Sequence, residues 1–425
     1  MRKALIILFC ILITVNIGCS NDANTDEHPN VSEHSDEGYC FDFHYGTLCS
    51  FMTGNNILET EDSIYYLYDD HLYFSDKSYK DFMPLCSRPN CSHDSEDCDA
   101  FIYTKSGIWI YGKHIYYVDD VFDENGSIAF TEPALWRMRL DGTQHEKLMQ
   151  LPLPDYGFTP VRNRWDYVFT DKYLYVSNTA FTDDPGNSGT NPYRSYLIDL
   201  DSFAVRDVYS SDNKDVPTYA GLPIAGDGSG IYSVGDSADR PGCMDLMFLD
   251  YNNLEGRRVG TLEENFYYLE GGFMIVDDSF EYLCWDPSQM RLAVWRMDLE
   301  TGANTLIKEG DGMEFKGYSM DWANGFVFDN YKRGDRFEWG FYVMDADLNE
   351  VETSLYEDVP DEVLSIRVFL QTNSFIFAAP PISFNPEHPD ELGISAAFAI
   401  PTWYIDKSEI GTGNLAWRRW APDGD

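Results

Sequence analysis

A two-part pattern repeats along the 425-residue chain and constrains its fold more than any other feature. The first part is an aromatic-rich strand, a short polar turn and a second strand, with the alternation typical of a two-stranded hairpin. An internal repeat of this kind has to be recognised first, because it determines the whole architecture. Clear copies occupy residues 64–74, 107–118 and 167–176.

The second part of the pattern is a strand that ends in aspartate and is followed by turn residues. Its copies return at intervals of about 50 to 60 residues, the length of one four-stranded antiparallel sheet in a β-propeller. Aromatic residues make up 16% of the chain, which agrees with an all-β protein. The copies are residues 135–142, 196–201, 246–250, 294–302, 341–345 and 403–406.

We predict an all-β fold, a β-propeller of seven blades, with six or eight left open because the fourth repeat is degenerate. A propeller closes when a strand from one terminus completes the blade of the other, and residues 41–51 and 415–420 are the candidates. The predicted blades lie near residues 63–104, 107–150, 167–210, 219–262, 266–309, 320–357 and 364–406.

The N-terminus predicts export and lipid anchoring. Arg2 and Lys3 precede an apolar run of about a dozen residues, which is typical of a signal peptide and too short to span a bilayer. The run ends in Asn16-Ile17-Gly18-Cys19, which resembles a bacterial lipobox, although leucine is usual where Asn16 stands. The resemblance implies that Cys19 carries the lipid.

These N-terminal features divide the chain into three predicted segments. Residues 1–18 are the expected signal peptide, and residues 19–38 are the lipidated cysteine with an acidic, disordered tether. Residues 39–425 form the single propeller domain, and no stretch in them approaches the ~20 apolar residues of a membrane helix. We therefore expect an extracytoplasmic protein, anchored to the bacterial cell membrane only through its lipid.

The charge limits the partners. The chain has 30 Lys and Arg against 72 Asp and Glu, a net charge of −42, so nucleic acid and anionic lipid headgroups are repelled. A protein or glycan ligand, cationic or bridged by calcium, remains compatible with this charge. The simpler explanation is that an acidic surface keeps a secreted protein in solution.

The most specific local feature is a cluster of three cysteines and one histidine within thirteen residues. A structural zinc ion takes four ligands of this kind in a tetrahedron, and Pro89-Asn90 would supply the turn that brings the first two together. Four protein ligands would close the site, so the zinc would be structural. The segment resembles C-x-x-P-x-C-x-H-x4-C segments in propeller lipoproteins of anaerobic gut bacteria. The candidate ligands are Cys86, Cys91, His93 and Cys98.

A loop disulfide is the alternative for the same residues. Export usually favours disulfides, and either Cys86 or Cys91 could pair with Cys98. Seven cysteines remain after those at positions 10 and 19 are set aside, and an odd number leaves at least one thiol without a disulfide.

Two phrases carry a resemblance to known propellers. Residues 136–143, WRMRLDGT, resemble the repeat of low-density-lipoprotein-receptor-like propellers found in bacterial lipoproteins. Residues 343–347, VMDAD, are similar to the corresponding phrase of TolB-type propellers. The resemblance implies the fold from about residue 60 onward and leaves function open, since propellers include both binders and enzymes.

No catalytic pattern is recognisable. The chain has no G-x-S-x-G elbow, no phosphate-binding G-x-x-x-x-G-K and no H-E-x-x-H. We therefore favour a binding or scaffolding module over an enzyme. The alternative is a carbohydrate-active hydrolase or lyase with a carboxylate site at the axis, where two acids would stand about 5–9.5 Å apart. A component of a larger envelope assembly is a third option.

Overall fold

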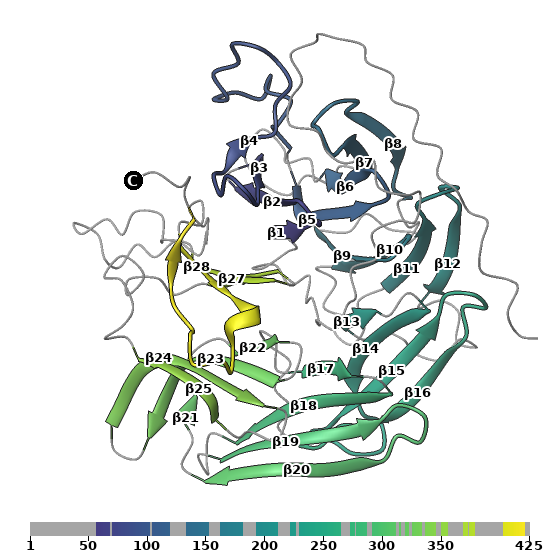
Figure 1. Ribbon diagram of the computed structural model, residues 1–425. Helices are drawn as coiled ribbons and strands as arrows, with labels where there is room; N and C mark the ends of the chain where they lie inside the picture. Colours follow the sequence, from purple (N-terminus) through teal and green to yellow (C-terminus); the bar gives the residue numbers. More distant parts are fainter. Residues whose placement is uncertain are drawn as a thin grey trace, which may run out of the picture. The chain divides into compact units, whose positions relative to one another are not determined.

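The structure is a computed structural model of the chain, and its strands build a series of separate antiparallel sheets (Figure 1). It describes residues 57–68, 70–102, 104–119, 133–152, 162–181, 193–210, 222–226, 229–264, 273–276, 278–286, 291–311, 314–315, 319–322, 325–333, 336–345, 350–355, 369–372, 374–378 and 403–420.

The first three sheets have four strands each, hydrogen-bonded in chain order. The first contains β1 (Ile57–Glu59), β2 (Ser63–Tyr68), β3 (His71–Asp76) and β4 (Met83–Pro84). The second contains β5 (Thr104–Tyr111), β6 (His114–Asp119), β7 (Ala134–Arg139) and β8 (Glu146–Gln150). The third contains β9 (Arg162–Thr170), β10 (Tyr173–Phe181), β11 (Tyr193–Asp199) and β12 (Val205–Ser210).

Four more sheets follow, and one of them has a fifth strand. They are β13 (Leu222–Gly226), β14 (Gly230–Asp236), β15 (Met244–Asp250) and β16 (Gly256–Thr261); then β17 (Phe273–Val276), β18 (Ser279–Asp286), β19 (Arg291–Asp298) and β20 (Asn304–Asp311). The sixth has β21 (Glu314–Phe315), β22 (Ser319–Trp322), β23 (Gly325–Arg333), β24 (Arg336–Asp345) and β25 (Glu350–Leu355). The last has β26 (Phe369–Gln371), β27 (Phe375–Ala378), β28 (Trp403–Asp406), the 3-10 helix η3 (Lys407–Glu409) and β29 (Arg418–Arg419).

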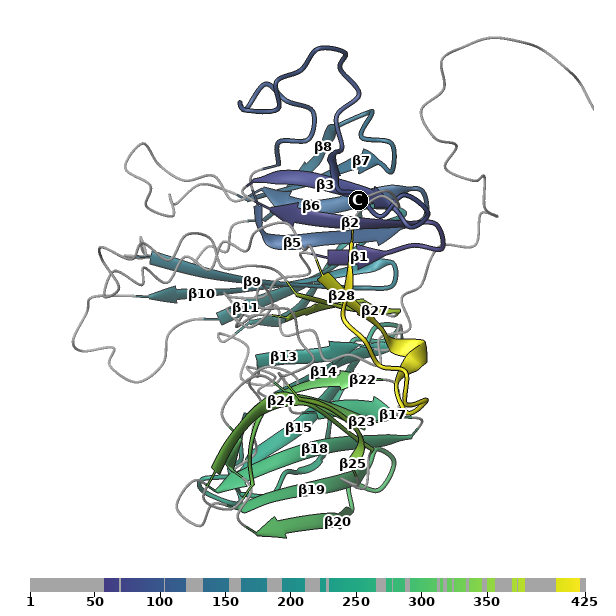
Figure 2. The same ribbon diagram turned by 60° about the vertical axis from the view of Figure 1, so that its left-hand side comes forward.

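The fold is the predicted all-β propeller, and the seven sheets of the described residues are its blades (Figure 2). Buried apolar clusters join each of the first four blades to the next. A further cluster joins the last blade to the first, through Phe377, Tyr404 and Trp420 on one side and Phe82 on the other. Because the last sheet packs on the first, the series closes into a ring.

A recurring contact builds the joints, our term for the packing between successive blades. The residue that follows the third strand donates its backbone N–H to the carbonyl that precedes the second strand of the same blade, at 2.8–3.4 Å. Its side chain then enters the cluster shared with the preceding blade. This residue is Leu140, Leu200, Tyr251 and Leu299 in the second to fifth blades.

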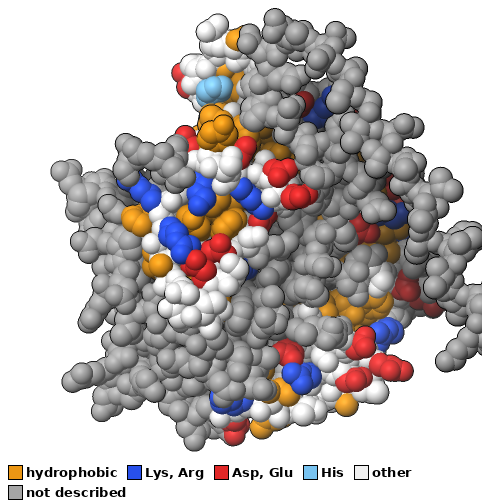
Figure 3. Space-filling model, in the orientation of Figure 1, with side chains coloured by type: hydrophobic (Ala, Val, Ile, Leu, Met, Phe, Trp, Pro, Cys, Tyr) orange, Lys and Arg blue, Asp and Glu red, His pale blue; other side chains and the backbone are white. Residues whose placement is uncertain are grey.

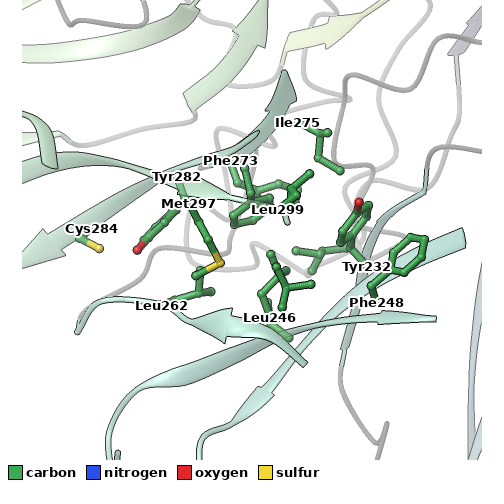
Figure 4. Close-up of a cluster of buried hydrophobic side chains, with 14 of the residues drawn as sticks. Tyr232, Leu246, Phe248, Leu262, Phe273, Ile275, Tyr282, Cys284, Met297 and Leu299 are labelled. Atoms are coloured by element: carbon green, nitrogen blue, oxygen red, sulfur yellow. The ribbon is translucent and has the colours of Figure 1, made fainter. Parts of the chain in front are cut away.

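The joint of the fourth and fifth blades shows the contact clearly (Figure 4). Leu299 lies among Leu246 and Leu262 of the fourth blade and Phe273 and Met297 of the fifth. Burial of aliphatic and aromatic side chains contributes roughly 25 cal/mol per Å² of apolar surface removed from water. The joints are therefore held mainly by the hydrophobic effect.

The aspartate in the repeated pattern shapes the turn that presents this residue. In the third blade, the Asp199 carboxylate accepts hydrogen bonds from the backbone N–H of Asp201 at 3.1 Å and of Ser202 at 2.8 Å. It also accepts a bond from the Ser202 hydroxyl at 2.9 Å. Asp298 and Asp406 make the same bonds to Thr301 and Ser408. An Asp side chain that mimics a backbone turn explains why the sequence repeats this residue.

The expected exchange of strands between the termini is not found in the described residues. Residues 418–419 do form an outer strand, but β29 pairs with β28 of its own blade, as Arg418 opposite Tyr404. All four strands of the first blade come from residues 57–84. Residues 41–51 lie outside the described residues. The seam, our term for the contact between the last and the first blade, is thus closed by side chains.

The predicted position of the first blade was also wrong in part. Its first strand, β1, lies before the predicted start at residue 63, and residues 85–103 form a connection rather than strands of the blade. The short β1 was missed because three residues, Ile-Leu-Glu, carry no alternation over the four residues or more that mark a strand.

The turn bonds generate a prediction about stability. Replacing Asp199 with alanine should lower the free energy of unfolding by about 1–2 kcal/mol, since hydrogen bonds to a charged group are lost. Urea denaturation measures the change, with Asp207→Ala on the exposed face of β12 as the control, expected within about 0.5 kcal/mol.

The pH dependence of the same variant has a definite sign. Burial acts against it, but the hydrogen bonds from Ser202 and the Lys172 ammonium lower the pKa of Asp199. A lowered pKa means that the stabilisation is present above the usual value of about 4 and is lost as pH falls through the folded value. The difference between native protein and variant should therefore shrink in acid. An unchanged difference at pH 3 would contradict the role of the charged carboxylate.

Candidate metal centre

The cysteine segment forms the loop that connects the first blade to the second. Both ends of the loop bind the start of β3: the N–H of Leu85 donates to the carbonyl of Leu72, and the N–H of Leu72 donates to the carbonyl of Ala100, both at 2.8 Å. The N–H of Ile102 reaches the carbonyl of Asp70, also at 2.8 Å. A loop tied at its base projects beyond the strands that it joins (Figures 1 and 2).

Within this loop a tight turn brings the first two cysteines together. The N–H of Cys91 donates to the carbonyl of Arg88 at 3.4 Å, and Asn90 has a φ of 63°. Proline in the second place and asparagine at positive φ in the third are the signature of a type II turn. The turn expected at Pro89-Asn90 is therefore present.

The four candidate ligands converge. One ligand atom from each of Cys86, Cys91, His93 and Cys98 can be chosen so that all four lie within 4.8 Å of one another. Four atoms at 2.0–2.3 Å from a tetrahedral ion stand about 3.3–3.8 Å apart, so a small contraction would complete the geometry. The His93 Nδ1 is already 3.3 Å from the Cys98 sulfur. A Cys₃His set of this kind can bind a metal.

Backbone donors also point at the sulfurs. The N–H groups of Arg88 and Asp99 donate to the Cys86 sulfur, and the N–H of Ala100 donates to that of Cys98. Although burial opposes it, these donors and the neighbouring thiols lower the pKa of Cys86. Burial, with the other thiols, raises the pKa of Cys98 to about 12. At Cys86 the donors therefore favour the thiolate, which is the form that binds metal.

A polar second layer surrounds the cluster. The Arg88 Nε lies 2.9 Å from an Asp99 carboxylate oxygen, and the Ser87 hydroxyl donates to the other oxygen at 2.9 Å. Three thiolates around a divalent ion leave one net negative charge, which a nearby guanidinium offsets. Such outer partners orient ligands and tune a metal site.

The loop also takes part in the joint between the first two blades. Leu85 is buried in the cluster shared by both blades, and the Tyr65 hydroxyl donates to the Leu140 carbonyl at 3.2 Å. Gly142, at a φ of 77°, passes so close that a Cβ there would stand 2.6 Å from the Leu85 carbonyl oxygen. Only glycine tolerates both this φ and this approach without strain. Order in the loop is therefore coupled to the packing of two blades.

The chemistry open to this centre follows from its ligands. All four come from the protein, and a site closed in this way is structural, since a catalytic zinc keeps an open position. Thiolate and imidazole ligands suit zinc better than the hard cations magnesium, calcium or manganese. Neither candidate disulfide is formed, since Cys86, Cys91 and Cys98 are free thiols. The metal alternative is the one that the positions of these side chains favour.

Comparisons with known proteins add little beyond the fold. No family model matches the chain, and no curated protein matches it. Solved structures with similar folds include an oligogalacturonate lyase in complex with manganese, at 14% identity and a TM-score of 0.45, over 81% of this chain and 88% of that one. TolB from Acinetobacter baumannii matches at 15% identity and a TM-score of 0.33, over 70% and 63% of the two chains.

A third similar structure is the β-propeller domain of the trilobed protease from Pyrococcus furiosus, at 11% identity and a TM-score of 0.36. It covers 60% of this chain and 71% of that domain. At such identities and scores the activities of these proteins say nothing about this chain. The assignment as a propeller therefore rests on the seven sheets and their packing.

The predictions for the N-terminus concern residues outside the described part of the chain. Cys19, the signal peptide and the tether of residues 19–38 lie outside the described residues. In the described part of the chain, no helix is both long enough and apolar enough to cross a bilayer. Sequence reasoning missed Asp99 as a partner of Arg88, and its only signal was its place directly after the last cysteine.

The centre generates a prediction about metal. The mature chain, purified without chelator or reductant, should retain one metal ion and resist alkylation of its three loop cysteines until a chelator is added. Cys91→Ser should lose the metal, and Cys243→Ser, a change at a buried cysteine of the fourth blade, should keep it. Metal analysis and intact mass measure both. A mass lower by two hydrogens with no metal would instead establish a loop disulfide.

Proposed function

We propose that this protein is a lipoprotein at the outer side of a bacterial membrane, where its propeller binds a protein or a glycan. Cys19 carries the lipid, the acidic tether spaces the ring from the bilayer, and zinc in the loop of residues 86–98 is structural. The observation that carries the proposal is the complete set of four protein ligands at the loop, which leaves no position for a substrate.

A propeller that is anchored by a lipid and has a metal-fixed loop is suited to bind a protein or a glycan. Loops on a rigid frame are where binding sites concentrate, and the metal would fix one such loop on the first two blades. The tip of the loop is exposed, from Arg88 to Asn90 and from Asp94 to Asp97, so it is available for contact. A binding role needs only this surface, whereas a metal enzyme would need an open coordination site.

The described residues give no specific support to the alternative function, a carbohydrate-active hydrolase or lyase with a carboxylate site at the axis. Glu59 on β1, the innermost strand of its blade, is a buried carboxylate, but both of its oxygens are engaged, by Lys77 at 2.5 Å and by the N–H of Ser374 at 2.8 Å. Glu281 on β18 is bound by Arg296 through one oxygen, and its other oxygen is buried without a hydrogen-bond partner among the residues described. A glycosidase needs a pair of carboxyl groups that face the substrate.

The surface charge is consistent with solubility rather than with a steering field. In the described part of the face in Figure 3, acidic and basic side chains lie interspersed among apolar ones. The net charge of −42 still disfavours nucleic acid and anionic lipid as partners. An uncharged or cationic protein or glycan surface is the partner that fits.

Lipid anchoring can be tested directly. Cys19→Ala should move the protein from the membrane fraction to the soluble fraction of the cells, because the multiple acyl chains that hold it are not attached. Globomycin, an inhibitor of lipoprotein signal peptidase, should cause accumulation of the precursor of the native protein. Cys10→Ala, within the apolar run, is the control and should leave the distribution unchanged. Retention of the Cys19→Ala protein in the membrane would contradict the proposal.

A further inference from the structure

The seam departs from the rule that the joints among the first five blades follow. The residue after the third strand is Leu140, Leu200, Tyr251 or Leu299 in the second to fifth blades. In the first blade the same place belongs to Lys77, whose N–H donates to the carbonyl of Asp62 at 2.9 Å, as the others do in their blades. A lysine therefore stands in the seam at the place where the joints among the first five blades bury apolar side chains; the last blade also has a lysine at this place, Lys407, whose N–H donates to the carbonyl of Ser374 at 2.8 Å.

A second polar residue stands in a matching place. Glu59 is the first-strand residue opposite the second residue of β2, Ile64. The residues at this register in the second, third and fifth blades are Ile110, Phe169 and Ile275, and all three are buried in their joints. Both polar residues of the seam thus stand at places that hold apolar side chains in the second, third and fifth blades, whereas the fourth blade has Gly226 at the first-strand place and the last blade has Gln371 and Lys407 at the two places.

The two side chains form a buried ion pair that also contacts the last blade. The Lys77 Nζ lies 2.5 Å from a Glu59 carboxylate oxygen, and the Glu59 side chain is 5% exposed. The other oxygen accepts the N–H of Ser374, in the turn before β27, at 2.8 Å. The ammonium also lies 6.0 Å from the centroid of the Phe375 ring. The pair therefore holds residues of both blades at once.

The remaining contacts of the seam are aromatic. Trp420 packs on Phe82 and donates its indole N–H to the Ser75 hydroxyl at 2.9 Å. Lys80 donates to the Tyr404 hydroxyl at 2.7 Å. Among the described residues no strand of one terminal blade joins the sheet of the other, and the two blades are not consecutive in the chain. Every other joint is crossed by a peptide connection.

We propose that the seam is a latch: the ring opens reversibly between the last and the first blade, and the Glu59–Lys77 pair controls the opening. A buried ion pair adds less stability than well-packed apolar side chains of similar volume, yet loss of one partner is strongly destabilising. The seam combines such a pair with the absence of a covalent link. Opening exposes the aromatic cluster of Phe82, Phe377 and Trp420 and gives lateral access to the inner strands.

Hydrogen exchange of the full mature chain, followed by mass spectrometry, tests the latch. Peptides covering residues 72–82 and 403–420 report on the seam, and residues 244–262 and 279–299 report on the joint of the fourth and fifth blades. In native protein we expect the hydrogen-bonded amides of the seam to exchange at least about tenfold faster than those of that joint. Equal rates in the two regions would overturn the proposal.

Two variants separate the latch from general destabilisation. Glu59→Gln should accelerate exchange at the seam by a further factor of about ten and leave the reference joint unchanged. Its matched control is Glu281→Gln, at a buried carboxylate whose partner Arg296 lies on the adjacent strand of the same blade, and its effect should remain within β18 and β19. Faster exchange throughout the ring in Glu59→Gln would count against a local latch.

A double variant that should stabilise the seam gives a test in which a folding defect cannot imitate the expected result. Glu59→Met with Lys77→Leu gives the seam the apolar character of the joints among the first five blades in roughly conserved volume. We expect exchange at the seam to slow to the rate of the reference joint. If the seam of this variant exchanges as fast as in native protein, the ion pair does not control the opening.

Discussion

The fold depends on one contact, made in the second to fifth blades by the residue that follows the third strand. Its backbone N–H ties the turn to its own sheet, and its side chain enters the preceding blade. Among the described residues no strand of one blade joins the sheet of the next, so the ring is held by side chains, mainly through apolar burial at these joints and in addition through hydrogen bonds such as that from Tyr65 to the Leu140 carbonyl. The aspartate of the repeat serves this contact, because its carboxylate holds the turn that aims the side chain.

This dependence explains why the cysteine loop lies where it does. The first joint contains Leu85, the residue just before Cys86, and the loop is bound at both ends to β3. A loop of this length without secondary structure of its own would be costly to order by packing alone. A metal bound by four side chains would supply the missing constraint, and the N–H groups aimed at the Cys86 sulfur favour the thiolate that such a metal needs.

Much of the architecture could be predicted because the repeat is local. The hairpins at 107–118 and 167–176 are the first and second strands of their blades, whereas that at 64–74 is the second and third strands of its blade. The hydrophobic alternation is the same in both cases, so the sequence pattern cannot distinguish them. For this reason the turns before His71 and His114 look alike in sequence but occupy different places in their blades, since His71 begins the third strand and His114 the second. The metal ligands could be listed from spacing, but the Arg88–Asp99 partner and the Glu59–Lys77 pair required the packing of segments distant in the sequence.

The acidity of the chain has a structural component that composition alone does not show. Aspartates such as Asp76, Asp199 and Asp298 accept hydrogen bonds in the turns, so these repeats add acidic residues as a consequence of their fold. A large net charge destabilises a compact state through self-repulsion, and the apolar joints have to withstand it. At the seam the repulsion acts on a joint without a covalent link. There Lys77 neutralises Glu59 at the contact itself, so the ring closes without burying an unpaired charge.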